Sequence, residues 1–141
     1  LQVGDKLLSF NIAEIDFNSP DYQQYTWQSE TLTTGDNFVE TTIASIEESQ
    51  ESDIVCFNGN NDIRITFTQP IFVKSNGIYK VKEAYYVEVG DSLIIVNSDG
   101  TKTEVPVTQI DYFTDQVVTV YQLNCEPYDW FFVNGMLVHN K

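Results

Sequence analysis

The chain repeats itself, and this constrains its fold more than any other feature. The tripeptide Val-Gly-Asp occurs at residues 3–5 and again at 89–91, and each copy is followed two residues later by Leu. Three further stretches parallel one another in the same order: 39–46 and 103–110, 55–57 and 119–121, and 71–77 and 131–135. The period is too long for a solenoid. The repeat therefore predicts two related halves of one domain.

Composition and turn signals predict that both halves are made of strands. Val, Ile, Thr, Tyr and Phe are abundant and there are only three alanines, a balance that favours β-structure. Residues 63–67 alternate and residues 117–123 are nearly all apolar, as strands are. Hairpin turns are predicted at Asn-Gly 76–77, Asp-Gly 99–100 and Asn-Gly 134–135. In each Val-Gly-Asp we expect a glycine with positive φ and an aspartate that caps the turn.

Length and charge limit the classes of protein. A chain of 141 residues suits one domain with a real core, and its 42% hydrophobic content fits a folded globule. No apolar run is long enough to span a bilayer, and no signal peptide opens the chain. The net charge is −14, and residues 7–63 contain no Lys or Arg, so we expect neither nucleic acid nor membrane as a partner. Because residue 1 is Leu, we expect a fragment or processed piece of a longer protein.

The cysteines predict no cofactor. Cys56 and Cys125 lack the paired spacing of a zinc site, and the chain has a single histidine, which argues against a Cys/His metal centre. The many acidic residues do not form the ordered loop of a calcium site. We interpret both cysteines as small buried hydrophobic residues.

Reactive side chains stand at the C-terminus. An Asn side-chain amide can attack its own backbone carbonyl, close a succinimide and release the next residue as an amine. A preceding His can supply the proton that this amine needs. Here His139 and Asn140 follow an aromatic-aliphatic strand, an Asn-Gly turn and a second apolar strand, which together predict a hairpin.

Residues 117–140 resemble the C-terminal motif of the Hint superfamily, the fold shared by inteins and hedgehog autoprocessing domains. The two Val-Gly-Asp phrases resemble those of inteins, so the resemblance covers nearly all of the chain. It implies an all-β horseshoe of two pseudo-two-fold related subdomains, with both chain ends at a central cleft. The acidity and the His-Asn-Lys ending resemble Hint segments of tailed-phage structural proteins, which implies a phage virion or host cytoplasm as location.

The resemblance also implies site residues and gaps. The family's N-terminal Cys or Ser nucleophile precedes the first Val-Gly-Asp by some twenty or more positions, so residues 1–141 are expected to form one Hint domain that lacks its first strand. The Thr-x-x-His motif that assists this nucleophile corresponds to Thr66 and Gln69, and Gln cannot shuttle a proton. The position of a second His holds Asp129, and the motif's acidic position holds Gln122. Asp129 is either a base toward Asn140 or an ordinary turn residue.

Several functions remain open at this stage. The acyl acceptor of the family is replaced by Lys141, so splicing of the chain as it stands is not expected. The His139–Asn140 pair either cleaves the bond to Lys141 or is a remnant in a structural domain. Alternatively, the chain is the long C-terminal part of an atypically split intein, which would splice in trans with a short N-terminal peptide. Otherwise the partners are neighbouring domains of the same protein. An unrelated β binding module would leave the repeat unexplained.

Residues 14–38, rich in acidic and turn residues, are expected to protrude as an insertion.

Overall fold

The computed structural model describes residues 1–12, 14–32, 38–60, 64–97 and 101–140. Within these ranges the chain is built from strands and two short helices. The helices are α1 (Asp21–Tyr25) and the 3₁₀ helix η1 (Ala84–Tyr86). The strands are β1 (Lys6–Phe10), β2 (Gln28–Ser29), β3 (Phe38–Glu51), β4 (Ile54–Phe57), β5 (Arg64–Thr66), β6 (Pro70–Ser75), β7 (Ile78–Glu83), β8 (Ser92–Val96), β9 (Lys102–Pro106), β10 (Ile110–Phe113), β11 (Val118–Glu126), β12 (Trp130–Val133) and β13 (Met136–His139).

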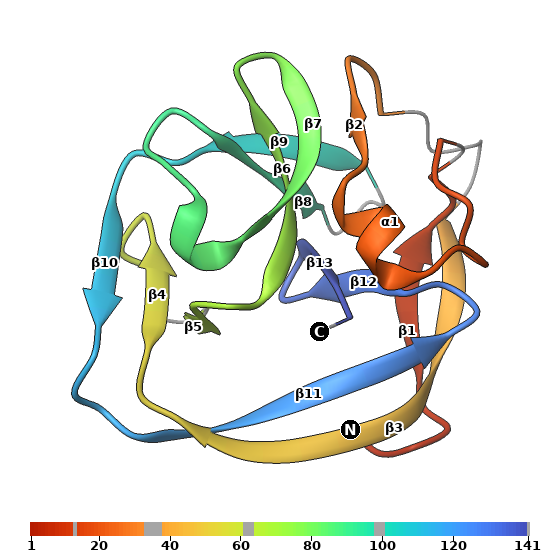
Figure 1. The fold of residues 1–141 in the computed structure, drawn as a ribbon, viewed down its shortest axis with the longest axis horizontal. Coiled ribbons are helices and arrows are strands. Elements are labelled where there is room, and N and C mark those ends of the chain that lie inside the picture. The colour runs from red at the N-terminus through yellow and green to blue at the C-terminus, as the bar shows by residue number, and fades with distance from the viewer. Residues whose placement is uncertain (13, 33–37, 61–63, 98–100, 141) are drawn as a thin grey trace.

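The strands form three antiparallel sheets. One has the order β1-β3-β11 and another the order β10-β4-β5. The third has the order β12-β13-β8-β6-β7-β2, and β9 also pairs with β8. The long strands β3 and β11 run side by side along one side of the molecule, and the C-terminal strand β13 ends near its centre (Figure 1). The prediction of an all-β architecture is confirmed.

The duplication predicted from the sequence is present in the strand register. Lys6 pairs with Thr42 at one end of the antiparallel β1–β3 pair, and the equivalent Ser92 pairs with Pro106 at the same end of the β8–β9 pair. Both registers run in step for five pairs in all, as far as Phe10 of β1 and Val96 of β8. Equivalent residues of the two repeats therefore make equivalent pairs.

The two Val-Gly-Asp turns share the same backbone conformation and equivalent hydrogen bonds. Gly4 and Gly90 have φ values of 94° and 102°, a region where a side chain would be strained. Their N–H groups donate to the carbonyls of Ile43 and Val107, each at 2.9 Å. The carboxylates of the following aspartates accept backbone N–H groups three residues upstream, each at 3.0 Å. The predicted glycine and aspartate roles are confirmed.

One predicted parallel is shifted by two residues. In the two sheets that link the halves, Ile46 pairs with Leu123 and the equivalent Ile110 pairs with Phe57. Phe57 thus corresponds to Leu123 and not, as the sequence comparison suggested, to Tyr121. Short apolar strands with few distinctive residues align equally well in neighbouring registers, and only the pairing decides between them.

The Asn-Gly turns close hairpins as predicted. Asn76 and Asn134 take positive φ values of 51° and 47°, as a two-residue turn of this kind requires. They connect β6 to β7 and β12 to β13. The predicted turn at residues 99–100 lies outside the described residues, as does Ile63 of the predicted strand 63–67. Of the remaining residues, Arg64–Thr66 form β5 and Phe67 lies in the turn that follows it.

The apolar side chains form two clusters, and the second includes residues of the segment 14–38. This cluster contains Trp130, Phe132 and Leu137 of the C-terminal hairpin together with Ile12 and Ile15. Ile15 is only 6% exposed, and Gln24 of α1 is only 1% exposed. Apolar residues of the segment 14–38 therefore pack against the C-terminal hairpin, and its assignment as an insertion stays a prediction.

Two further predictions concern the cysteines and the membrane. Cys56 and Cys125 are both free thiols and are almost fully buried, which confirms their reading as small core residues. Among the residues that the structure describes, no helix is long and apolar enough to cross a bilayer.

Candidate functional site

The C-terminal hairpin carries the reactive pair into the interior. Strand β13 lies between β12 and β8 and also pairs with β6, where Val138 faces Ile71. All four residues of β13 are buried because sheet neighbours flank the strand on both sides. His139 is fully buried and Asn140 is 3% exposed. A buried polar pair must find hydrogen-bond partners within the protein.

The side-chain amide of Asn140 is held by the end of β11 and by Asp129 in the connection that follows it. Its Nδ2 donates to Asn124 Oδ1 at 3.0 Å, to Asp129 Oδ1 at 3.1 Å and, more weakly, to the Cys125 carbonyl at 3.4 Å. Its Oδ1 accepts the Cys125 N–H at 3.3 Å. The backbone N–H of Asn140 donates to the Asp129 carbonyl at 2.6 Å. The nitrogen that would attack therefore faces a carboxylate.

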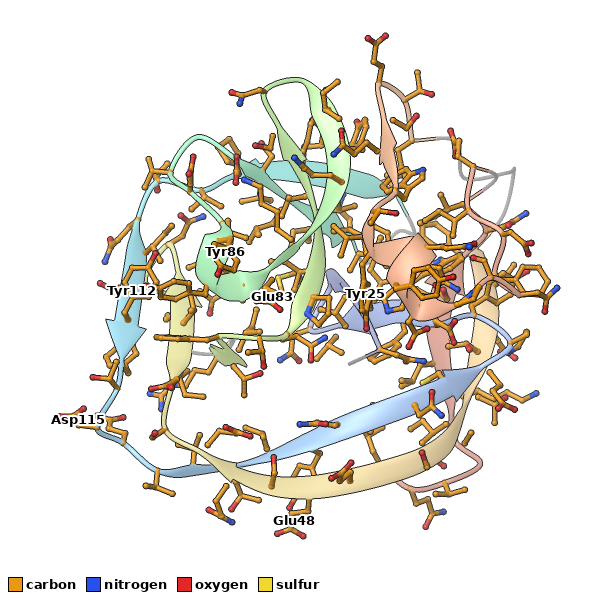
Figure 2. The ribbon with its side chains drawn as sticks, in the orientation of Figure 1. Tyr25, Glu48, Glu83, Tyr86, Tyr112 and Asp115 are labelled. Atoms are coloured by element: carbon orange, nitrogen blue, oxygen red, sulfur yellow. The ribbon has the colours of Figure 1, made fainter. Side chains whose placement is uncertain are left out.

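The backbone carbonyl of Asn140 faces two hydrogen-bonding groups. His139 Nδ1 lies 2.8 Å from this oxygen, and the hydroxyl of Tyr25 donates to it from 2.7 Å. Figure 2 shows Tyr25 between helix α1 and the C-terminal strand. This carbonyl belongs to the peptide bond that would be cleaved. The structure thus brings donors to the carbonyl and an acceptor to the attacking amide of the same residue.

The imidazole of His139 is fixed on its other side by Gln24. Its Nε2 lies 2.6 Å from Gln24 Oε1. The Gln24 amide cannot turn around without loss, because its Nε2 donates to Asp129 Oδ2 at 3.0 Å and to the Ser19 carbonyl at 2.8 Å. The Tyr25 ring meets the imidazole edge-on, with centroids 4.8 Å apart.

Burial and nearby charges shift the pKa values of the site. Burial lowers the pKa of His139, while the Asn140 carbonyl and the carboxylates of Asp21 and Asp129 act in the opposite direction. Burial raises the pKa of Asp129, although the hydrogen bond from Gln24 opposes the change. Burial and the carboxylates of Asp21, Asp129 and Glu83 raise the pKa of Tyr25 to about 12, so its hydroxyl keeps its proton at neutral pH.

Comparison with known proteins identifies the fold. No protein-family model matches the chain, and no curated protein sequence matches it. Among solved structures, an intein from a hyperthermophile covers 98% of this chain and 98% of its own length, with a TM-score of 0.63 and 18% identity. The intein-like domain from Clostridium thermocellum covers 98% of this chain and 96% of its own length, with a TM-score of 0.57 and 21% identity. This chain has the Hint fold of inteins and intein-like domains.

Other inteins match over less of their length. The chain spans 64% of the length of the PabCDC21-1 intein, with a TM-score of 0.62 and 22% identity. It spans 81% of the DnaB intein from Synechocystis sp. PCC 6803, with a TM-score of 0.66 and 10% identity. At these identities the likeness establishes the Hint fold, and activity must be argued from the residues of this chain.

The Thr66–Gln69 pair lies beside the C-terminal residues. Gln69 Nε2 donates to the His139 carbonyl at 2.6 Å and to the Pro70 carbonyl at 3.1 Å. The carbonyl of Thr66 accepts the Gln69 N–H at 3.1 Å. Gln69 therefore ties the end of β13 to the turn before β6. A Gln at this position provides hydrogen bonds to the backbone, whereas the family's His would move protons.

A groove of about 210 Å³ opens next to these residues. Thr66, Gln69 and His139 line one part, and apolar residues of β11, β12 and β13 line much of the rest. Gln122, at the motif's acidic position, also lines this groove and pairs with Glu47 across the β3–β11 ladder. Thr66, Gln69 and Gln122 thus share one groove with His139, whereas Asp129 and Asn140, which contact each other, are not among the residues that line it.

The carboxylates near His139 do not by themselves make a metal centre. One ligand atom each of Asp21, Asp129 and His139 lie within 4.8 Å of one another. Asp129 and His139 already bind Asn140 and Gln24. We therefore assign these atoms to hydrogen bonding.

The sequence did not point to three residues of this site, namely Gln24, Tyr25 and Asn124. Asn124 follows a predicted strand, but nothing in its surroundings distinguishes it from any polar strand residue. Gln24 and Tyr25 lie in α1, and a helix of five residues is too short to show a helical hydrophobic pattern. The nearest signal was Ser19-Pro20-Asp21, because Pro and an acidic residue favour a helix start.

Proposed function

We propose that this Hint domain cleaves the peptide bond between Asn140 and Lys141 by cyclisation of the Asn140 side chain. One observation carries the proposal: the attacking amide of Asn140 contacts the Asp129 carboxylate, while its own carbonyl oxygen contacts His139 Nδ1. If His139 and Asn140 were only a remnant, they would need to be packed in the core. They would not also need an acceptor at the Asn140 amide and a donor at the Asn140 carbonyl.

The reaction follows from these contacts. Asn140 Nδ2 attacks the Asn140 carbonyl carbon and forms a C–N bond, and one amide proton passes to Asp129. The carbonyl oxygen takes up the electron pair and is stabilised by the N–H of His139. When this intermediate collapses, the bond to the Lys141 nitrogen breaks, and protonated His139 supplies the proton that the leaving amine needs. The products are a C-terminal succinimide and a free Lys141 amine.

The test uses the chain extended after Lys141 by a folded reporter domain. We expect slow release of the reporter from the wild-type protein, and Asn140→Ala should abolish it because Ala cannot form the ring. His139→Ala should slow release by about 10²-fold or more, the range for losing a positioned acid. Asn60→Ala, a change of the same type at an exposed turn, should release the reporter at the wild-type rate. Release that persists in Asn140→Ala, or a wild-type protein that stays intact for days, would contradict the proposal.

Trans-splicing with a short N-terminal partner is the second candidate, and the groove favours it. In the described part of the chain, β5 forms one edge of its sheet and β11 one edge of another, and residues of both line the groove beside Thr66 and His139. Unpaired strand edges are templates for an added strand. One neighbour, the AceL NrdHF intein, is a split intein by its description (TM-score 0.58, 16% identity).

This candidate is tested with a synthetic peptide whose sequence is encoded directly upstream of Leu1 or in a neighbouring reading frame. Binding should protect the edge amides of β5 and β11 from hydrogen exchange, and a peptide of the same composition in scrambled order should not. Equal exchange with both peptides would exclude this partner. The architectural role in a tailed-phage particle remains a prediction from sequence resemblance.

A further inference from the structure

Helix α1 contributes two neighbouring side chains to the C-terminal site. Gln24 contacts the imidazole of His139 and Tyr25 contacts the carbonyl of Asn140. Both residues come from the segment 14–38, which the sequence predicted to be a protruding insertion. In Figure 2 the labelled Tyr25 points from α1 toward the end of the chain. A segment that served only to cover the hairpin would not need polar side chains against both the His139 imidazole and the Asn140 carbonyl.

We propose that α1 is a working part of the cleavage site, in which Tyr25 is a second donor to the oxyanion and Gln24 is a positioning residue that holds His139 in its proton-donating form. This inference rests on the proposed cyclisation of Asn140. It adds two residues to that reaction, one catalytic through direct contact with the reacting carbonyl and one acting through His139.

The hydrogen-bond pattern around Gln24 fixes the protons of His139. Because the amide nitrogen of Gln24 donates to Asp129 and Ser19, its oxygen must face His139 Nε2. An oxygen at Nε2 and another at Nδ1 are both acceptors, so both ring nitrogens must donate, and only the imidazolium has two N–H groups. The site is thus arranged for the protonated form, the form able to give a proton to the leaving amine.

Tyr25 and His139 form a pair of donors around a single oxygen. Their atoms lie 2.7 and 2.8 Å from the Asn140 carbonyl oxygen, within the range for an oxyanion hole. The hydroxyl remains a donor across the whole range in which Asp129 and His139 titrate, because burial and nearby carboxylates raise the pKa of Tyr25 to about 12. Negative charge that develops on the oxygen would be shared by two hydrogen bonds.

Asp129 joins the helix to the nucleophile. One carboxylate oxygen accepts the Asn140 amide and the other accepts the Gln24 amide. The charged groups that face His139 are Asp21 of α1 and Asp129 of the β11–β12 connection. Glu83 at the end of β7 adds a negative charge near Tyr25. The carboxylates of Asp21 and Asp129 favour a positive imidazole, and the burial of the ring opposes it.

The kinetic experiment compares neighbouring residues of the same helix in the extended protein. Tyr25→Phe should slow cleavage by about 10²-fold, as for loss of an oxyanion donor, without a change in the shape of the pH profile. Tyr22→Phe, at a position that is 67% exposed, should leave the rate unchanged. Gln24→Glu should move the fall in rate at high pH to a higher pH, because a carboxylate against Nε2 favours the imidazolium. Gln23→Glu, one residue away and exposed, should not.

A second readout does not depend on cleavage. Nitrogen-15 chemical shifts of His139 in the unextended chain should show a higher pKa in Gln24→Glu than in Gln23→Glu. The carbon-13 chemical shift of the Asn140 backbone carbonyl should change in Tyr25→Phe and not in Tyr22→Phe. If the wild type cleaves but the α1 variants match their controls, the role of α1 is refuted and the cyclisation stands. If the wild type does not cleave, the proposed function and the catalytic part of this inference both fail. The chemical shifts then decide whether α1 holds the protonated imidazole.

Discussion

Asp129 is the residue on which the two readings of the site diverge. As a turn residue it would bond to its own backbone, but its two carboxylate oxygens accept the amides of Asn140 and Gln24. A carboxylate in this position can accept the proton of the attacking amide only when it is ionised. Burial raises its pKa above 3.8, and burial lowers that of His139 below 6.5.

These two shifts predict the pH dependence of cleavage. Cleavage needs ionised Asp129 and protonated His139, so the rate should fall when the pH drops through the raised pKa of Asp129. It should fall again when the pH rises through the lowered pKa of His139. The two shifts move the acidic and basic limits toward each other, so the rate should pass through a narrow maximum between them. Asp129→Asn should reduce the rate and remove the fall on the acidic side, which the release of the reporter measured across pH will show. A rate in Asp129→Asn equal to the wild type would favour the turn reading.

At the residue scale, the sequence predicted the residues whose side chains are reactive in themselves, namely His139 and Asn140. An Asn that follows the only histidine, at the end of an apolar hairpin, is unusual by itself. Tyr25 and Gln24 have ordinary chemistry, and their position against Asn140 and His139 depends on how a distant segment folds back. No local pattern encodes a contact between residues more than a hundred positions apart.

At the element scale, the two Val-Gly-Asp turns share a backbone but differ in their surroundings. Asp91 is 4% exposed and binds Lys82 at 2.8 Å, whereas Asp5 is half-buried. Burial alone would raise the pKa of Asp91, but hydrogen bonds from Lys82, the Glu88 N–H and Ser75 outweigh it and lower the pKa. The second copy of the motif is therefore tied to β7 by a largely buried ion pair.

This difference predicts unequal effects of the same substitution. Asp91→Asn should lower the free energy of unfolding by about 2–3 kcal/mol at neutral pH, as for loss of a hydrogen bond between charged groups that leaves a partner buried. Asp5→Asn should lower the free energy of unfolding by less. Because the folded pKa of Asp91 lies below 3.8, its contribution is present above that pH and is lost as the pH falls through the folded value. Urea unfolding of both variants at neutral and acidic pH measures this, and equal losses in the two variants would contradict it.

Elements with a strong local signal were predicted well. The Asn-Gly hairpins needed only a turn residue able to take positive φ between apolar strands. The strand 117–123 was found but continues to Glu126, because its ladder with β3 passes a register shift after Asn124. Helix α1 was missed because it consists of a single short turn. Its position depends on the packing of Ile12, Ile15 and nearby aromatic residues against the C-terminal hairpin.

At the scale of the whole molecule, the repeat predicted two related halves, and the matching registers of the β1–β3 and β8–β9 pairs bear this out. The prediction that residues 1–141 form one domain that lacks its first strand remains open. It has a physical consequence, because a missing strand leaves unpaired backbone groups along a sheet edge. We expect the isolated chain either to bind a partner strand or to associate with itself.

Sedimentation over a range of concentrations, together with hydrogen exchange of the β5 and β11 edge amides, tests this expectation. Growth in mass with concentration, or fast edge exchange that a partner peptide slows, would support a missing strand. A chain that stays monomeric at high concentration with fully protected edge amides would contradict it. The amides of β6, which lies within its sheet between β7 and β8, serve as the internal control.

The mass of the fragment released from the extended protein tests the central claim most directly. Cyclisation leaves a succinimide at Asn140, so the fragment should be lighter by one water than a chain that ends in the free acid of Asn140. It should regain this mass as the ring hydrolyses to Asn and isoAsn. A fragment that carries the full mass of the free acid from the first time point, with no isoAsn at position 140, would show hydrolysis by another route and contradict cleavage by Asn140.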